Sequence, residues 1–135
     1  MELEEELRPF INEWILKEGL HPINEYRICW RIPDVVGIRE GRIEVAVEMK
    51  LSDWKGALRQ ASNYTMFSVK SYIAMPSEKQ ALVLRHIREF RRKGIGALMV
   101  RGDGSVVELI ASGRHQAPFS YAAPCTRSDT MNIHP

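Results

Sequence analysis

The chain contains few of the residues that hold small secreted domains or zinc-binding domains together. It has two cysteines and four histidines among its 135 residues, and the histidines lie far apart. Two cysteines form no disulfide framework, and no cysteines or histidines have the close spacing of a zinc site. We therefore expect neither a disulfide-rich scaffold nor a structural zinc centre.

The sequence also lacks long hydrophobic runs. No stretch approaches the roughly 20 consecutive apolar residues that a membrane-spanning helix needs. The first ten residues, MELEEELRPF, are acidic, whereas a secretory signal begins with basic residues and continues with an apolar core. These absences predict a cytoplasmic protein that does not bind membranes. The apolar share of 44% and the charged share of 27% are ordinary for a globular protein, and the length suits one compact domain.

A net charge of +2 hides an uneven distribution of charge along the chain. Residues 1–25 hold seven acids and only two basic residues, so the remainder has an excess of positive charge. Five basic side chains crowd into the segment RHIREFRRKG, namely Arg85, Arg88, Arg91, Arg92 and Lys93. Such a cluster is able to hold phosphates through salt-sensitive attraction, and it is equally typical of the solvated face of a helix.

The spacing of apolar residues predicts alternating helices and strands. The predicted elements are, in chain order, a helix over 3–14 that Gly19 ends, three strands at about 23–30, 33–39 and 42–51, a helix capped by Ser52 or Asp53, a strand over SVKSYIAMP, a helix from Ser77 to Gly94, and a hairpin around GDG. The predicted class is α/β, a mixed sheet flanked by helices in the order αβββαβαββ. This domain covers residues 1–113, and residues 114–135 form an extended arm or tail, because they contain three prolines and little periodicity.

The predicted strand at 42–51 carries two ionisable residues, Glu48 and Lys50, among apolar and β-branched ones. Because side chains alternate along a strand, Glu48 and Lys50 point to the same face. An exposed ion pair would contribute at most about 1 kcal/mol to stability. A buried pair costs several kcal/mol per ion before the attraction between the charges offsets the cost. Stability alone therefore does not explain these two residues.

Asp34 stands at the start of the preceding strand, directly after Pro33. If the two strands form a hairpin, Asp34 and Glu48 both lie far from the EGR loop, at the same end of the sheet. Two carboxylates beside an amine suit a hard cation such as Mg²⁺, which takes one or two carboxylates and leaves other positions to water and phosphate. A neighbouring lysine is able to orient or deprotonate an attacking water and to offset charge that develops on phosphate.

The Pro-Asp pair at Asp34 followed by Glu48-Met49-Lys50 resembles the motif of the PD-(D/E)XK nuclease superfamily, which has the restriction-endonuclease-like fold. The order of that fold's core is similar to the order predicted for about 3–75. The resemblance implies that Asp34 and Glu48 bind Mg²⁺ or Mn²⁺, assisted by the backbone carbonyl of Met49. It also implies that Lys50 serves the attacking water and that the protein is an endonuclease whose partner is DNA.

The next predicted helix contains Gln60 and Tyr64, one turn apart. They look like the Gln-x-x-x-Tyr pattern of the RecB-like branch, whose glutamine and tyrosine approach the active site and DNA. The alternative is a half-buried tyrosine that packs beside a polar boundary residue. Many members also take an acid from the first helix, and Glu6 lies next to the apolar face of that helix, although acids in a first turn are also favourable in themselves.

Two alternatives to a nuclease stay open. One is a member of the same fold that binds nucleic acid or protein without cutting, and the other is a small α/β domain in which the motif is a coincidence. Full exposure of Glu48 together with Lys50 would favour the coincidence. A chain of this size has little room for a separate domain that reads sequence, which leaves a homodimer or a partner subunit as the source of specificity.

The register of the hairpin decides whether one ion can reach both carboxylates. With an unbroken two-residue loop at Glu40 and Gly41, Asp34 would lie opposite Val47, and Glu48 would point to the other face. With a three-residue loop, or with a one-residue bulge between the loop and the site, Asp34 lies directly across from Glu48. The metal site requires one of these last two arrangements.

Overall fold

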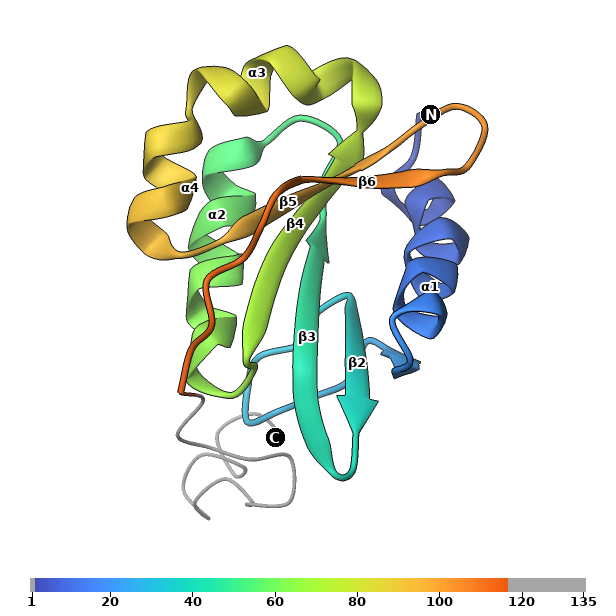
Figure 1. The fold of residues 1–135 in the computed structure, drawn as a ribbon, viewed down its shortest axis with the longest axis vertical. Coiled ribbons are helices and arrows are strands. Elements are labelled where there is room, and N and C mark those ends of the chain that lie inside the picture. Colours follow the sequence, from blue (N-terminus) through green and yellow to red (C-terminus); the bar gives the residue numbers. More distant parts are fainter. Residues whose placement is uncertain (1, 117–135) are drawn as a thin grey trace.

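The computed structural model describes residues 2–116, and a six-stranded mixed sheet forms its centre (Figure 1). The strands follow the order β1-β2-β3-β4-β5-β6, with β1 at His21–Asn24, β2 at Val35–Arg39, β3 at Arg42–Met49, β4 at Lys70–Pro76, β5 at Gly96–Val100 and β6 at Val106–Ile110. The pairs β3–β4 and β4–β5 are parallel, and the other pairs are antiparallel. The predicted α/β class with a mixed sheet is confirmed.

Four α-helices and three short 3-10 helices flank this sheet. In chain order they are η1 (Glu4–Leu7), α1 (Arg8–Lys17), α2 (Trp54–Asn63), η2 (Tyr64–Met66), η3 (Ser77–Lys79), α3 (Gln80–Arg85) and α4 (Ile87–Lys93). Figure 1 shows α1 on one side of the sheet and α2, α3 and α4 on the other. None of the helices between residues 2 and 116 is long and apolar enough to cross a membrane.

The core consists of two apolar layers, one on each face of the sheet. Val47 and Met49 of β3 pack in the layer beneath α1, whereas Ile73 of β4 packs in the layer beneath α2. A third, smaller cluster lies on the α2 side and contains Ala46 and Tyr64. The alternation predicted for the third strand is therefore confirmed, and Glu48 belongs to the α2 side.

Predicted helix ends are confirmed at two glycines. Gly19 and Gly94 both adopt left-handed backbone conformations, with φ of 80° and 70°. At the end of α1, the N–H groups of Gly19 and Leu20 donate to the carbonyls of Leu16 and Ile15, which closes the helix in a Schellman motif. Asp53 caps the start of α2, because its carboxylate accepts a hydrogen bond from the N–H of Gly56.

The single helix predicted from Ser77 to Gly94 is wrong, because the segment is a 3-10 turn followed by two short helices. The break falls at His86, whose imidazole stacks on Trp54 of α2 with ring centroids 3.9 Å apart. Sequence spacing carries no information about such a contact. The capping box predicted at Ser77 is also not formed, because the residue that precedes α3 is Lys79 and it makes no side-chain cap hydrogen bond.

The first strand is shorter than predicted, because β1 ends at Asn24. Glu25 has a left-handed conformation with φ of 51°, and its N–H donates to the carbonyl of Asp34, so the chain leaves the sheet there. The connection from β1 to β2 then forms a tight turn at 28–31 before it returns to β2. The predicted arm at 114–135 lies almost entirely outside the described residues.

The hairpin of β2 and β3 combines a two-residue loop with a bulge. Arg39 pairs with Arg42 across the loop, and the register shifts between Gly37 and Ile38. Beyond the shift Val35 pairs with Val47, so the preceding residue, Asp34, lies across from Glu48. Two arrangements would permit a shared ion, a three-residue loop or a one-residue bulge. The chain adopts the bulge.

Gly37 lies at the bulge and packs closely beneath α1, which gives a prediction for stability. A Cβ atom at Gly37 would lie 2.9 Å from Cγ2 of Ile15 and 3.0 Å from Cδ1 of Leu20. We expect Gly37→Ala to lower the free energy of unfolding by about 1–3 kcal/mol through overpacking, measured by urea denaturation. In Gly102→Ala, where the Cβ meets no atom within 4 Å, the change should stay within about 0.5 kcal/mol. Equal stability of the two variants would contradict the tight packing.

Candidate active site

Glu48 is a buried carboxylate that a tyrosine hydroxyl contacts. Glu48 is only 5% exposed, which argues against the alternative in which Glu48 and Lys50 are surface charges. The hydroxyl of Tyr64 donates a hydrogen bond of 2.5 Å to its Oε1. Within residues 2–116 no salt bridge reaches Glu48 or Asp34. Burial, and then the nearby charge of Asp34, raise the pKa of Glu48 to about 7.

Asp34 is held by hydrogen bonds to its side chain and to its backbone carbonyl. Its Oδ2 accepts a hydrogen bond of 2.7 Å from the backbone N–H of Met49, and its own carbonyl accepts one of 2.6 Å from the guanidinium of Arg8. Burial also raises the pKa of Asp34, although the Met49 hydrogen bond works against the shift. The sequence predicts that Met49 assists a metal ion through its backbone carbonyl. In the structure the backbone N–H of Met49 holds the carboxylate of Asp34.

Lys50 follows Met49 at the end of β3, where its side chain is half-buried. Its backbone N–H donates to the carbonyl of Ala74 in β4, which holds the chain at the sheet. Burial raises the pKa of both Asp34 and Glu48, and the charge of Lys50 opposes that rise. Asp34, Glu48 and Lys50 are therefore brought together at one end of the sheet.

Arg8 is a part of the site that sequence reasoning missed. Its side chain is only 12% exposed and reaches the carbonyl of Asp34 from the start of α1. The same guanidinium pairs with Glu5 at 2.8 Å and with Glu25 at 3.2 Å. Arg8 therefore ties the first helix to both ends of the β1–β2 connection. Its position three residues after Glu5, as a lone base among acids, was the available signal.

Tyr64 and Gln60 differ in their burial and in their hydrogen bonds. Tyr64 is 3% exposed and its hydroxyl is bound to Glu48, so the predicted DNA contact is corrected to a role in holding the carboxylate. Burial raises the pKa of Tyr64, and the charge of Glu48 raises it further, so the hydroxyl keeps its proton. Gln60 is half-buried one turn earlier on α2, and its side chain makes no hydrogen bond with a described residue.

Glu6, the acid predicted from the first helix, lies away from the two carboxylates, in the cap of η1. Glu6 is exposed, and its carboxylate accepts hydrogen bonds from the N–H groups of Glu2 and Leu3, which cap η1. The charge of Glu4 is instead the one that contributes to the raised pKa of both Asp34 and Glu48, after burial. Glu4 is therefore the acid of the first turn that lies closer to the two carboxylates.

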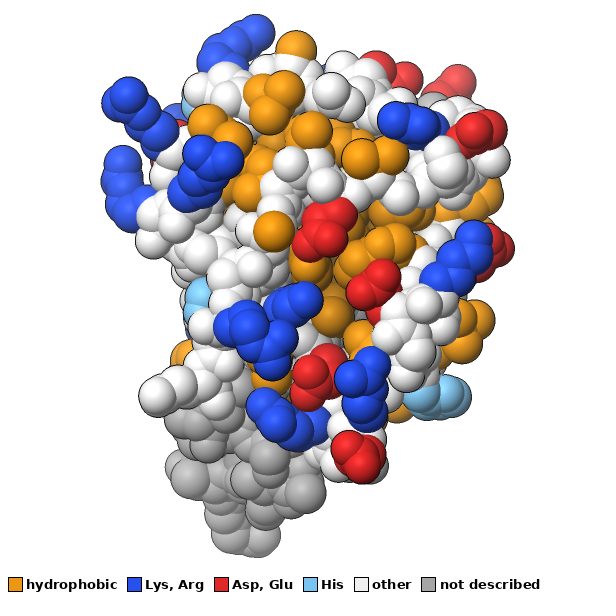
Figure 2. Space-filling view, viewed as in Figure 1, with side chains coloured by type: hydrophobic (Ala, Val, Ile, Leu, Met, Phe, Trp, Pro, Cys, Tyr) orange, Lys and Arg blue, Asp and Glu red, His pale blue; other side chains and the backbone are white. Residues whose placement is uncertain are grey.

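The predicted basic cluster lies on α3 and α4, on the α2 side of the sheet. Figure 2 shows Lys and Arg side chains gathered over these helices. All five residues of the cluster are exposed: Arg85, Arg88, Arg91, Arg92 and Lys93. No hydrogen bond or salt bridge within the described part of the chain connects them to Asp34 or Glu48. They remain available to an external anion.

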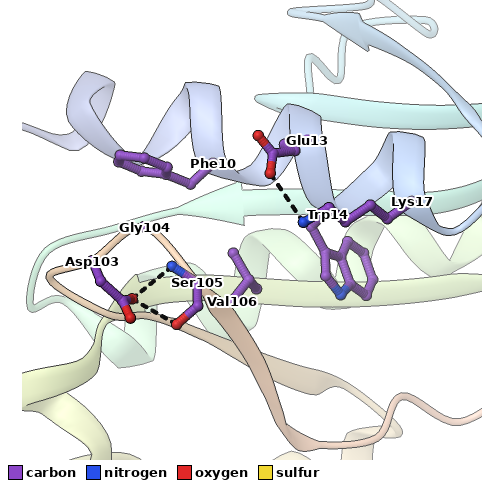
Figure 3. Close-up of a pocket in the computed structure, with 8 residues that line it drawn as sticks. All are labelled: Phe10, Glu13, Trp14, Lys17, Asp103, Gly104, Ser105 and Val106. Atoms are coloured by element: carbon purple, nitrogen blue, oxygen red, sulfur yellow. Dashed lines mark hydrogen bonds and ion pairs between the residues drawn. The ribbon is translucent and has the colours of Figure 1, made fainter.

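A groove of about 380 Å³ lies between α1 and the β5–β6 turn (Figure 3). Phe10 and Trp14 supply its aromatic wall, and the charged groups at its rim already have partners. The carboxylate of Asp103 accepts two hydrogen bonds from Ser105, and Lys17 pairs with Glu13 at 3.0 Å. None of the residues that line this groove belongs to the Asp34–Glu48 pair.

The donor set at Asp34 and Glu48 fits one hard cation. Within residues 2–116 no three His, Cys, Asp or Glu side chains converge on a point, so a site made entirely of protein ligands is not preformed there. Two facing carboxylates are nevertheless the protein share that Mg²⁺ takes when water and phosphate fill its other positions. A buried Glu48 with a raised pKa is a group whose charged form a cation would stabilise.

Comparisons with known proteins add no family to these observations. No family model, curated protein or solved structure is significantly similar to the chain.

The raised pKa of Glu48 predicts how the stability of the metal-free protein depends on pH. The folded state holds this proton more tightly than the unfolded chain, in which glutamate has its ordinary pKa of 4.5. The stabilisation is therefore complete below pH 4.5, is lost as the pH rises to about 7, and stays lost above it. We expect a loss of about 3 kcal/mol across this window, measured by urea denaturation at a series of pH values.

Glu48→Gln tests the assignment of that pH dependence. The variant lacks the titrating group, so it should lose most of the dependence and keep a smaller part from Asp34. Glu44→Gln makes the same change on the same strand and should leave the profile as in the parent protein. A profile that is identical in parent protein and Glu48→Gln would show that Glu48 titrates normally.

Proposed function

We propose that this protein is a metal-dependent nuclease that hydrolyses DNA phosphodiester bonds, with a restriction-endonuclease-like fold. The single observation that carries the proposal is the register of β2 and β3, in which a bulge brings Asp34 across from a buried Glu48. Lys50 follows the last residue of β3, and its charge acts on both carboxylates. The motif read from the sequence thus corresponds to three side chains that are neighbours in space.

The chemistry follows from the environment of each group. A bound Mg²⁺ or Mn²⁺ would supply Lewis acidity at a phosphate oxygen and a water of lowered pKa. Asp34 and Glu48 would hold the ion, with Met49 N–H and Tyr64 O–H fixing the orientation of the two carboxylates. The ammonium of Lys50 would orient the attacking water and offset negative charge on the phosphate.

The charge distribution supports a polyanionic substrate. The basic cluster on α3 and α4 is exposed and has no partner among the described acids, as expected of side chains that hold phosphates. Four of the seven acids of the first 25 residues belong to η1 and α1, and Figure 1 shows α1 on the other side of the sheet. DNA would therefore approach from the side of α2, α3 and α4.

Lys50→Ala tests the proposed chemistry. The variant should lose cleavage by at least about 100-fold, because a positioned proton-transfer group contributes that much or more. Its affinity for Mg²⁺ and for DNA should stay close to that of the parent protein, since lysine is not a ligand. The measurement is cleavage of linear, nicked, branched and single-stranded DNA with Mg²⁺ or Mn²⁺, beside calorimetric titration of the metal.

Asp34→Asn supplies the matched control. It keeps an oxygen for the Met49 N–H and removes one negative charge, so Mg²⁺ affinity should fall while the fold persists. Unchanged Mg²⁺ affinity would remove Asp34 from the site, and undiminished turnover of Lys50→Ala would remove Lys50. A parent protein that binds DNA and cuts none of these substrates would favour the non-cutting alternative.

The basic cluster gives a separate prediction for DNA binding. Arg88→Gln/Arg92→Gln should reduce the slope of log affinity against log salt by about one to two, because fewer counterions are released. Arg42→Gln/Arg101→Gln removes two exposed arginines elsewhere and should leave the slope unchanged. Fluorescence anisotropy over a salt series measures both, and an equal slope in the two variants would return the cluster to a solvated helix face.

A further inference from the structure

Trp30 is a large aromatic side chain presented at the tip of a tight turn. The turn lies in the connection from β1 to β2, where Ile28 and Arg31 exchange two backbone hydrogen bonds of 2.8 and 2.9 Å. Cys29 within it has a left-handed conformation with φ of 57°. Trp30 remains 46% exposed, although apolar surface of this size is usually buried. The turn therefore holds an indole ring outside the core in a fixed place.

The other two tryptophans are engaged by neighbouring side chains. Trp54 stacks on His86 with an interplanar angle of 18°, and the ammonium of Lys55 lies 5.7 Å from its ring centroid. Trp14 packs edge-on against Tyr72, with ring centroids 5.4 Å apart. Among the described residues, Trp30 is the only tryptophan whose ring has no aromatic or cationic neighbour. None of the described aromatic or cationic side chains covers this ring, and Trp30 is 46% exposed.

The turn is next to the candidate active site. Ile28 packs against the cluster that contains Tyr64, the residue whose hydroxyl holds Glu48. Trp30 precedes Asp34 by four residues, which span about 14 Å at most. Stacked bases rise about 3.4 Å each along one strand, so this distance corresponds to about four nucleotides or fewer. A strand of nucleic acid at Asp34 would therefore reach the indole.

Positive charge accompanies the ring. Arg27 is exposed and Arg31 is half-buried, three residues before and one residue after Trp30. Neither forms a salt bridge with an acid in the described part of the chain. An exposed indole with arginines three residues before and one residue after it in the chain matches single-stranded nucleic acid, in which bases stack on the ring and phosphates pair with the cations.

We propose that Trp30 stacks on an unpaired base of the substrate while Arg27 and Arg31 hold the flanking phosphates, so that the enzyme acts on DNA that is single-stranded within a few nucleotides of the cut. This inference rests on the proposed nuclease function. A duplex keeps its bases stacked on one another and offers the indole none, so the platform selects unpaired strands.

The test separates binding from cleavage by using Lys50→Ala as the parent for every variant. Fluorescence anisotropy measures the affinity for a thymidine 12-mer and for a duplex of the same length. Adding Trp30→Ala should weaken single-strand binding by about 5- to 150-fold, the equivalent of about 1–3 kcal/mol, and should change duplex binding less than twofold. Trp30→Phe should recover most of the loss, because phenylalanine also stacks.

Leu16→Ala is the matched control, because Leu16 is an apolar residue of α1 that is 59% exposed. Equal single-strand affinity of Trp30→Ala and Leu16→Ala would overturn the platform, as would tighter binding of the duplex than of the single strand. If the protein with Lys50 intact cuts no substrate while Trp30→Ala still loses single-strand binding, the nuclease function fails and the platform stands. If duplexes are cut and Trp30→Ala changes nothing, the platform fails and the nuclease stands.

Discussion

One unpaired residue in β3 determines which side chains of the β2–β3 hairpin lie on each face of the sheet. Glu44 has no partner in β2, because Gly37 pairs with Val45 and Ile38 pairs with Ile43. As a result Ile43 and Ala46, which a regular strand would place on opposite faces, both pack on the α2 side. Without this bulge the side chains of Asp34 and Glu48 would lie on opposite faces of the sheet, and they could not share a cation. The candidate site thus depends on a single backbone irregularity.

The cation that contacts the backbone of Asp34 forms no salt bridge with its carboxylate. Arg8 binds the carbonyl of Asp34 and the side chains of Glu5 and Glu25, but not the carboxylate of Asp34. Glu48 receives only the neutral hydroxyl of Tyr64, which supplies a hydrogen bond without neutralising charge. Burial raises the pKa of the buried Glu48 and of the half-buried Asp34, and no salt bridge among the described residues offsets that rise. The arrangement orients both carboxylates and leaves their charge to be neutralised by something from solution.

Local signals allowed part of the fold and of the site to be predicted. The alternation around Glu48, the cap at Asp53 and the ends at Gly19 and Gly94 depend on a few adjacent residues, and the structure has all of them. Contacts between distant segments were not predictable from spacing. The break at His86 results from stacking on Trp54, and the role of Arg8 results from a strand that lies 26 residues away. The first turn is a 3-10 helix, in which residues rotate by more than in an α-helix, so the face predicted for Glu6 was wrong.

Glu48 also interrupts the apolar layer on the α2 side. Its neighbour in β4, Ile73, belongs to the cluster beneath α2, whereas Ala46 on its own strand belongs to the cluster with Tyr64. An apolar side chain at this position would join the two clusters and remove a buried charge, which usually leaves stability unchanged or improves it. A glutamate here therefore works against stability. Such a cost at a buried position is expected of residues that are kept for binding or catalysis, which is the role proposed for Glu48.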